Sequence, residues 1–184
     1  MKSRIYTLAL LFVVVSAHGV FANDDSADLT ATAQVGAAVE VLQQEDLNFG
    51  VIVPGTNGII TVSNGDTGGS GTDGTTTVGE FLVSGQANAS VLLNFDLPNE
   101  LLNGGSATLP IFFDAADYGW HAGADESNAN FTPADFGAGN DLSLTFDGTT
   151  PEITILLGGR VEPSNTQETG TYSATVTLTA TQDL

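Results

Sequence analysis

The sequence predicts an all-β fold, specifically an immunoglobulin-like sandwich of two sheets. Apolar and polar residues alternate with a period of two along most of the chain, and no stretch keeps a helical period over three turns. About eight or nine short segments of this kind follow one another, each bounded by Gly, Pro, Asn or Asp. No helices are expected between them to supply crossovers, which fits a two-sheet sandwich. A closed barrel is the alternative architecture.

The start of the chain has the pattern of a secretory signal peptide. Lys2 and Arg4 precede an apolar run at residues 8–15 (LALLFVVV), and residues 20–22 (VFA) suit a cleavage site. The run is shorter than the roughly 18 residues that span a bilayer, and no later stretch reaches that length. We therefore expect export to the periplasm and then the cell surface, with no membrane insertion. The expected parts are a signal peptide at 1–22, an N-terminal extension at 23–36 and a sandwich at 37–184.

Each expected strand follows from its own side-chain pattern. In residues 29–41 every odd position is apolar and mostly small, whereas most even positions are polar. In residues 47–53 (LNFGVIV) larger apolar residues alternate, and Pro54 with Gly55 ends the segment. Residues 43–46 form a polar break between these two strands. Further strands are expected at residues 59–62, 80–84, 90–97, 107–113, 141–146, 152–157 and 172–181.

Two stretches lack such a pattern. Residues 64–77 contain too much glycine for a regular element and predict a mobile loop. Residues 114–140 form the longest irregular stretch and carry Trp120, His121 and several acids. A loop of that length in a compact domain is usually functional or mobile.

The chain is strongly acidic, with 22 Asp and Glu residues against three Lys and Arg residues. Loss of Lys2 and Arg4 with the signal peptide would leave Arg160 alone against the 22 acids, a formal charge of −21. Such a charge excludes nucleic acid and anionic lipid as electrostatic partners. It also keeps exposed strands from aggregating, so the acidity is explained by solubility or a saline habitat as well as by a ligand.

The residue types do not predict enzymatic chemistry. After export the single histidine would be His121, and the chain has no cysteine, so a nucleophile and its base would have to be built around one imidazole. Carboxylate pairs occur by chance in any acidic protein, and no concentration of sugar-stacking aromatics accompanies them. No cofactor is expected.

Calcium or carbohydrate binding is the alternative function. One GGxGxD match at residues 68–73 makes Asp66 and Asp73 candidate calcium ligands, but that repeat binds ions only in tandem, so no metal site is predicted. Trp120 among the acids of residues 114–140 offers a platform for a sugar. The second hypothesis is therefore a monomeric exported binding module that uses residues 114–140.

The two ends of the exported chain are the most informative. The N-terminal segment alternates cleanly, and the chain stops almost as soon as the strand at 172–181 does. We expect a sheet that lacks its final edge strand, so that its neighbour exposes unpaired backbone groups and an apolar groove. An extended segment from another subunit can complete such a sheet.

These features resemble the subunits of archaic chaperone-usher pili, the related spore-coat-U-like proteins and a family of bacterial exported domains of unknown function. The residues that carry the resemblance are the alternating N-terminal segment, LNFG at 47–50 and GTYSATVTLTAT at 170–181 with its GxY signature. The middle of the chain matches only in the rhythm of its strands.

The resemblance implies a pilin-like fimbrial subunit that polymerises by donor-strand exchange, with a periplasmic chaperone and an outer-membrane usher as partners. The implied donor plug consists of Leu29, Ala31, Ala33 and Val35. The implied acceptor-groove strand carries Tyr172, Ala174, Val176 and Leu178. A non-enzymatic surface subunit serving adhesion or biofilm cohesion is thus the first hypothesis, and a self-complemented monomer stays open as the structural alternative.

Overall fold

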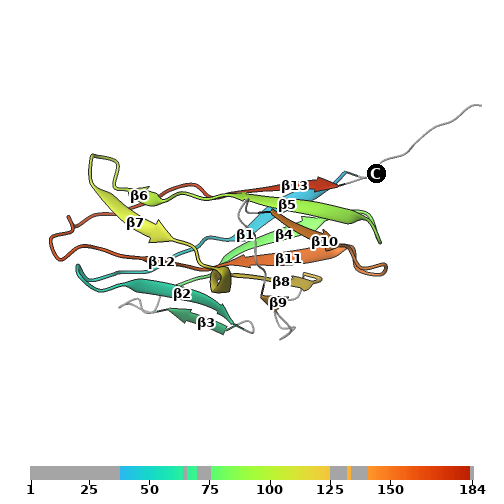
Figure 1. Ribbon diagram of the computed structural model, residues 1–184, viewed down its shortest axis with the longest axis horizontal. Coiled ribbons are helices and arrows are strands. Elements are labelled where there is room, and N and C mark those ends of the chain that lie inside the picture. Colours follow the sequence, from blue (N-terminus) through green and yellow to red (C-terminus); the bar gives the residue numbers. More distant parts are fainter. Residues whose placement is uncertain (1–37, 64–65, 70–75, 125–131, 134–140, 183–184) are drawn as a thin grey trace, which may run out of the picture. The chain divides into compact units, whose positions relative to one another are not determined.

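In the part of the chain that the computed structural model describes, thirteen short strands form three antiparallel sheets (Figure 1). The described residues are 38–63, 66–69, 76–124, 132–133 and 141–182. They all belong to one compact unit, Val35–Leu184. The four predicted donor-plug residues and the predicted signal peptide lie outside the described residues, so the expected divisions at residues 22 and 36 stay predictions.

The first sheet has the strand order β1-β4-β11-β8-β9. Its central strand β11 is buried along Ile153 to Leu157, because both of its faces are covered. At one edge, β1 pairs only with β4 and is mostly exposed. The bounds are β1 (Glu40–Glu45), β4 (Gly79–Ser84), β11 (Glu152–Leu157), β8 (Tyr118–Ala122) and β9 (Thr132–Pro133).

The other two sheets have the orders β10-β5-β13 and β3-β2-β12-β7-β6. In β5 every second side chain is buried, which is the pattern of a sheet with one face on the core. A short 3₁₀ helix, η1 (Ala115–Asp117), connects β7 to β8. The bounds are β10 (Asp141–Thr145), β5 (Ser90–Asp96), β13 (Thr177–Gln182), β3 (Asp66–Gly69), β2 (Gly58–Ser63), β12 (Gly159–Val161), β7 (Thr108–Phe112) and β6 (Glu100–Leu102).

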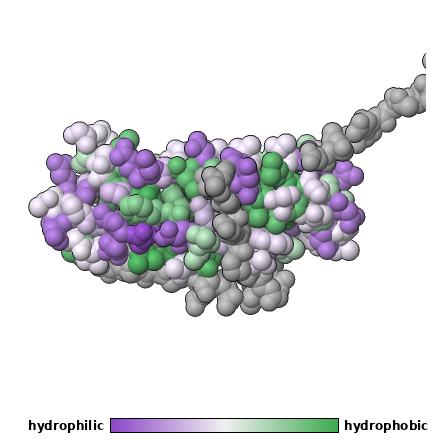
Figure 2. Space-filling view, viewed as in Figure 1, coloured by the Kyte–Doolittle hydropathy of each residue, from purple (hydrophilic) through white to green (hydrophobic). Residues whose placement is uncertain are grey.

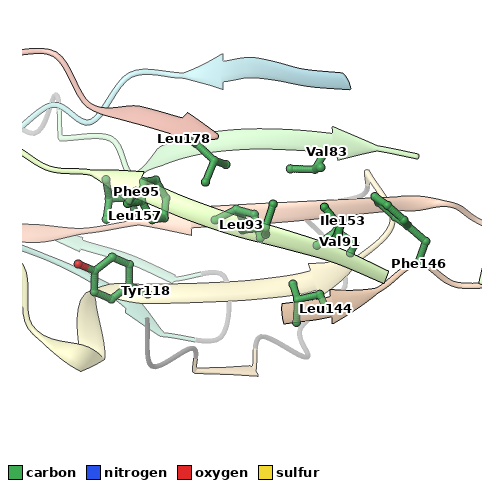
Figure 3. Packing of buried hydrophobic residues seen from close by; sticks show 11 residues of the cluster. Val83, Val91, Leu93, Phe95, Tyr118, Leu144, Phe146, Ile153, Leu157 and Leu178 are labelled. Atoms are coloured by element: carbon green, nitrogen blue, oxygen red, sulfur yellow. The ribbon is translucent and has the colours of Figure 1, made fainter. Parts of the chain in front are cut away.

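Two apolar clusters hold the sheets together. The larger cluster joins the first sheet to the β10-β5-β13 sheet (Figure 3), and the smaller one lies under the third sheet. Each sheet keeps two edge strands among the described residues, so the fold is an all-β sandwich. The larger cluster comprises Val83, Val91, Leu93, Phe95, Tyr118, Leu144, Phe146, Ile153, Ile155, Leu157 and Leu178. The smaller one comprises Phe49, Ile60, Val78, Leu109, Ile111, Leu156 and Val161.

The structure confirms the all-β prediction and most of the expected strands. The expected strands at 59–62, 80–84, 90–97, 107–113, 141–146 and 152–157 correspond to β2, β4, β5, β7, β10 and β11. The polar break predicted at 43–46 was largely wrong, because β1 continues to Glu45 in pairing with β4. The described stretches contain no helix with the length and hydrophobicity needed to traverse a bilayer.

Two predicted loops contain strands instead. Residues 66–69 form β3, because their backbone pairs with β2 from Ser63 to Ile60 and pairing does not depend on side chains. The stretch 114–140 is not one irregular loop either. It contains η1, β8 and β9, and β8 pairs with the buried strand β11.

Candidate strand-binding groove

A groove with a volume of about 880 Å³ lies between two segments of the chain, residues 46–54 and 167–176. Its floor is largely apolar and includes Phe81, Leu101, Leu109, Ile111, Leu157 and Val161. Phe81 packs edge-on against the core residue Phe95, with ring centroids 6.0 Å apart, so the floor is continuous with the core. Leu109, Ile111, Leu157 and Val161 are at most 7% exposed, whereas Phe81 and Leu101 are half-buried and keep some apolar surface open to water.

Residues 46–52 form the first wall of the groove. Asn48 exchanges both backbone hydrogen bonds with Thr77, at 3.0 and 2.9 Å. In an extended segment successive residues turn their N–H and C=O groups to opposite sides, so Leu47 and Phe49 direct theirs away from Thr77 and toward the groove. Gly79 allows this wall to lie close, because a Cβ atom there would be 3.2 Å from the Cβ of Leu47.

Residues 170–176 form the second wall. Ser173 exchanges both backbone hydrogen bonds with Leu102 of β6, each at 2.9 Å. Tyr172 and Ala174, on either side of Ser173, therefore turn their N–H and C=O groups toward the groove. No backbone partner of these two residues lies within the described ranges.

The hydroxyl of Tyr172 fixes the shape of the second wall. It donates a hydrogen bond to the backbone oxygen of Glu168 and accepts one from Nε2 of Gln167, both at 2.8 Å. Nε2 of Gln167 also donates to the backbone oxygen of Thr108 in β7, at 2.9 Å. The wall is thus attached to β6 through its backbone and to β7 through a side-chain network.

The walls continue two edge strands that belong to different sheets. The first wall follows β1, whose partner is β4, and the second precedes β13, whose partner is β5. Within the described residues, Leu47 and Phe49 in the first wall and Tyr172 and Ala174 in the second have no backbone partner, and both segments line the same groove. A segment of about seven residues, extended at roughly 3.3 Å per residue, matches the length of the second wall, whereas Gly50, with a φ of 68°, interrupts the first.

The sequence-predicted acceptor residues divide into two groups. Tyr172, Ala174 and Val176 line the groove. Leu178 does not, because it is buried in the larger core cluster, where Figure 3 shows it near Phe95 and Leu157. The segment they share is also not a continuous strand, since β13 begins only at Thr177.

Sequence reasoning missed the first wall as part of a site. Residues 47–53 are predicted to form an ordinary strand, but in the described part of the chain Asn48 makes an isolated bridge with Thr77 and the segment forms no named strand. Val51 and Val53 continue the apolar pattern of Leu47 and Phe49 in the sequence, yet in the structure these two residues are 59% and 52% exposed. Other hydrophobic residues reach the surface nearby, and Figure 2 shows them among hydrophilic residues in the half of the view that carries β6, β7 and β12.

The rim of the groove is acidic. Glu45, Asp46 and Glu168 are among its lining residues and are exposed, and no Lys or Arg lines it. The guanidinium of Arg160 is engaged elsewhere. It lies 3.8 Å from a carboxylate oxygen of Asp114, forms an ion pair with Glu162 and lies 4.7 Å from the centroid of the Phe112 ring.

The acidic stretch 114–140 provides no exposed aromatic platform in its described part. Trp120 is half-buried against the core, and His121 is only 4% exposed, with Nδ1 3.1 Å from the backbone oxygen of Ala122. Tyr118 packs on Phe95 with ring centroids 5.8 Å apart, and burial, followed by the neighbouring carboxylates, raises its pKa to about 12. These side chains are core residues of the sandwich.

The candidate calcium ligands do not form a described site. Asp66 is on β3, and Asp73 lies outside the described residues. Within the described ranges no group of three or more His, Cys, Asp or Glu side chains could hold a metal ion.

Comparison with known proteins gives one match. A family model described as a domain of unknown function (DUF4402) matches residues 39–181, a range that includes both walls and the floor of the groove. No curated protein and no solved structure matches the chain. Because the family model covers most of the sequence, the chain belongs to the family of the domain of unknown function DUF4402.

Proposed function

We propose that this protein is a non-enzymatic, pilin-like structural subunit that assembles at the cell surface by donor-strand complementation. The observation that carries the proposal is the groove, with two open backbone edges over an apolar floor. Unpaired backbone groups are costly in water, and so is the apolar surface that Phe81 and Leu101 keep partly exposed. A strand inserted between the walls would pair with these backbone groups and cover this apolar surface.

The resemblance to chaperone-usher pilus subunits supports the same function. Its two motifs are far apart in the sequence, and they form opposite walls of one groove: LNFG lies in the first wall, and the beginning of GTYSATVTLTAT forms the second. By that resemblance, a periplasmic chaperone would fill the groove before assembly and an outer-membrane usher would receive the subunit.

The proposed occupant is the segment 29–35 (LTATAQV) of a second copy. It is uncharged, and Leu29, Ala31, Ala33 and Val35 alternate along one face. Its seven residues equal the length of the second wall. Small plug residues also suit a floor that large side chains such as Phe81 already occupy.

The short connection to β1 favours a second copy over the chain's own leader. Residues 36–39 separate the plug from β1, so a leader that turned back would pair residues 29–35 with Glu40–Glu45 itself. The part that then reached the groove would be residues 23–28, which contain three aspartates. Burying those charges between apolar walls would be unfavourable. A leader from another molecule can place its uncharged part there.

A proline variant of the leader tests the proposal. Proline has no N–H and cannot complete a strand ladder, so Ala31→Pro with Ala33→Pro removes the donor without changing the charge. The chain without its signal peptide should form polymers in analytical ultracentrifugation, and the double variant should stay monomeric. Ser26→Pro, outside the plug, is the matched control and should polymerise like the parent.

The double variant also tests the acceptor side. Its groove is intact, so it should bind a synthetic LTATAQV peptide in isothermal titration calorimetry. Polymerisation of the double variant at the parental rate would refute the donor role of residues 29–35. A parent that is monomeric and does not bind the peptide would show that its own leader fills its groove.

A further inference from the structure

The groove and the residues just before its proposed occupant carry charge of the same sign. Glu45 and Asp46 line the end of the groove next to β1, and Glu168 lines the start of the second wall. No basic side chain lines the groove, and the whole chain has a formal net charge of −19. The leader adds three aspartates at positions 24, 25 and 28, directly before the uncharged plug.

We propose that this acidic rim makes the groove an ionic-strength gate, so that a second copy inserts its leader only when salt screens the rim from the leader's aspartates. The inference rests on the proposed strand insertion and states that ionic strength regulates it. The range of repulsion between exposed charges falls from about 30 Å at 0.01 M salt to about 3 Å at 1 M. The apolar floor and the backbone hydrogen bonds of the walls are not weakened by salt in this way.

The geometry favours screening over a bridging cation. Glu45 ends β1, Asp46 begins the first wall and Glu168 lies two residues before the second wall, and the described residues contain no group of three or more ligands for a metal. Repulsion therefore acts at both sides of the groove without a built ion site. Sodium, potassium and calcium salts should be equivalent when compared at equal ionic strength.

Two synthetic peptides separate the gate from the groove. The receptor is the Ala31→Pro, Ala33→Pro chain, which keeps its groove but cannot donate. Peptide LTATAQV lacks the aspartates, and peptide NDDSADLTATAQV includes them. Between 20 and 500 mM NaCl the Kd of the longer peptide should fall by about tenfold or more, within the range of electrostatic effects on association. The Kd of the shorter peptide should change by less than about twofold, because it carries no side-chain charge.

Neutral substitutions at the three rim carboxylates test whether these residues cause the salt dependence. Glu45→Gln, Asp46→Asn and Glu168→Gln together should make the longer peptide bind at 20 mM NaCl nearly as tightly as at 500 mM. The matched control, Asp96→Asn with Asp141→Asn and Asp147→Asn, removes the same charge at exposed positions that do not line the groove. It should keep most of the salt dependence.

The possible outcomes are distinguishable. If neither peptide binds at any salt concentration, the proposed strand insertion is wrong, and the gate with it. If both peptides bind and respond equally to salt, the groove stands and the gate is refuted. The gate is also refuted if the neutral rim and its control behave alike, or if calcium acts beyond its ionic strength.

Discussion

At the scale of single residues, Tyr172 connects the second wall to the rest of the sandwich. Its ring is half-buried, and its hydroxyl both accepts from Gln167 and donates to the backbone of Glu168. The side chain therefore determines the course of the chain from residue 168 to residue 172. The GxY signature can be understood as a device that holds the open edge in place.

Tyr172→Phe keeps the aromatic ring but removes the hydroxyl, so it should make the second wall less rigid. Loss of the hydroxyl should lower the free energy of unfolding by about 1 kcal/mol, the usual net value of such hydrogen bonds. Binding of LTATAQV should weaken as well, because the wall loses its preorganised shape. Urea unfolding and calorimetry measure the two effects. Thr179→Val, which removes an exposed hydroxyl on β13, should leave both unchanged; equal effects of the two variants would contradict this role of Tyr172.

Asp117 is a second residue whose environment is unusual. It is buried at the end of η1, and its Oδ2 accepts a hydrogen bond of 2.7 Å from the backbone N–H of Asp114. Burial raises its pKa above the ordinary value of 3.8, and the charge of Asp114 adds to the effect, while the hydrogen bond and Arg160 oppose it. The folded state consequently holds the proton to a higher pH than the unfolded state does.

Asp117→Asn should therefore change the pH dependence of stability. Below pH 3.8 the aspartate of the parent and the asparagine of the variant are both neutral. Above the raised pKa the aspartate is charged, and its burial costs desolvation free energy that the neutral asparagine avoids. The variant should gain stability relative to the parent as the pH rises from 3.5 to 7, since an asparagine oxygen can still accept from Asp114. Urea unfolding at both pH values measures this gain. A difference that is the same at both pH values would show that ionisation of Asp117 does not matter.

At the scale of secondary-structure elements, each wall contains one residue, Asn48 or Ser173, that forms an isolated bridge to a neighbouring segment. This arrangement predicts an alternating pattern of amide exchange. Ser173 and Asn48 donate to Leu102 and Thr77, whereas the amides of Tyr172, Ala174 and Phe49 point toward the groove.

Hydrogen exchange followed by NMR should detect this alternation in the leader-proline double variant. Ser173 and Asn48 should be protected with and without LTATAQV, because their bonds are already formed. The groove-facing amides should exchange fast in the free protein and become protected by at least about tenfold when the peptide pairs with them. If the peptide binds but the groove-facing amides exchange as fast as in the free protein, the peptide does not add as a strand.

The elements also show what a sequence pattern can predict. Strands with clear alternation, such as β5 and β7, were predicted nearly to the residue, because burial on one face leaves a period of two. β8 escaped prediction because it contains Gly119 and a Trp-His pair next to several acids. β12 was not predicted because it is only three residues long and is separated from β11 by Gly158 alone, so the sequence pattern shows no boundary between the two strands.

The groove could be predicted only in part. Alternation in residues 172–176 predicts that Tyr172, Ala174 and Val176 face inward, but every residue from 169 to 176 lines the groove, so the lining does not distinguish them from Ser173 and Thr175. The alternation does not indicate whether a neighbouring strand is present, since an unpaired segment has the same pattern as a paired one. Leu178 was placed on the groove for that reason, although the pairing of β13 with β5 puts it in the core.

At the scale of the whole molecule, net charge opposes compactness. The chain carries 22 acidic residues and three basic ones, and most of the described acids lie on the surface. Folding brings these charges closer than they are in the unfolded chain, so self-repulsion lowers stability at low salt. The absence of cysteine leaves burial and strand pairing to oppose it.

Thermal unfolding of the leader-proline variant, followed by circular dichroism, should reveal this repulsion. Between 20 and 500 mM salt the Tm should rise by about 2–4 °C, which corresponds to roughly 1 kcal/mol for a chain of this size. Sodium and potassium chloride should act alike, because screening depends on ionic strength. A Tm that is constant across this range would show that the surface acids are too far apart to repel measurably.

The two walls are anchored to different neighbours, one to Thr77 beside β4 and the other to Leu102 in β6. In a fibre joined through this groove, a tensile force along the fibre would pull the guest segment lengthwise between both anchors. All its main-chain bonds would then be loaded in shear and would have to rupture nearly together, whereas peeling would break them one at a time. Such a joint would resist drag from flowing liquid without any covalent link.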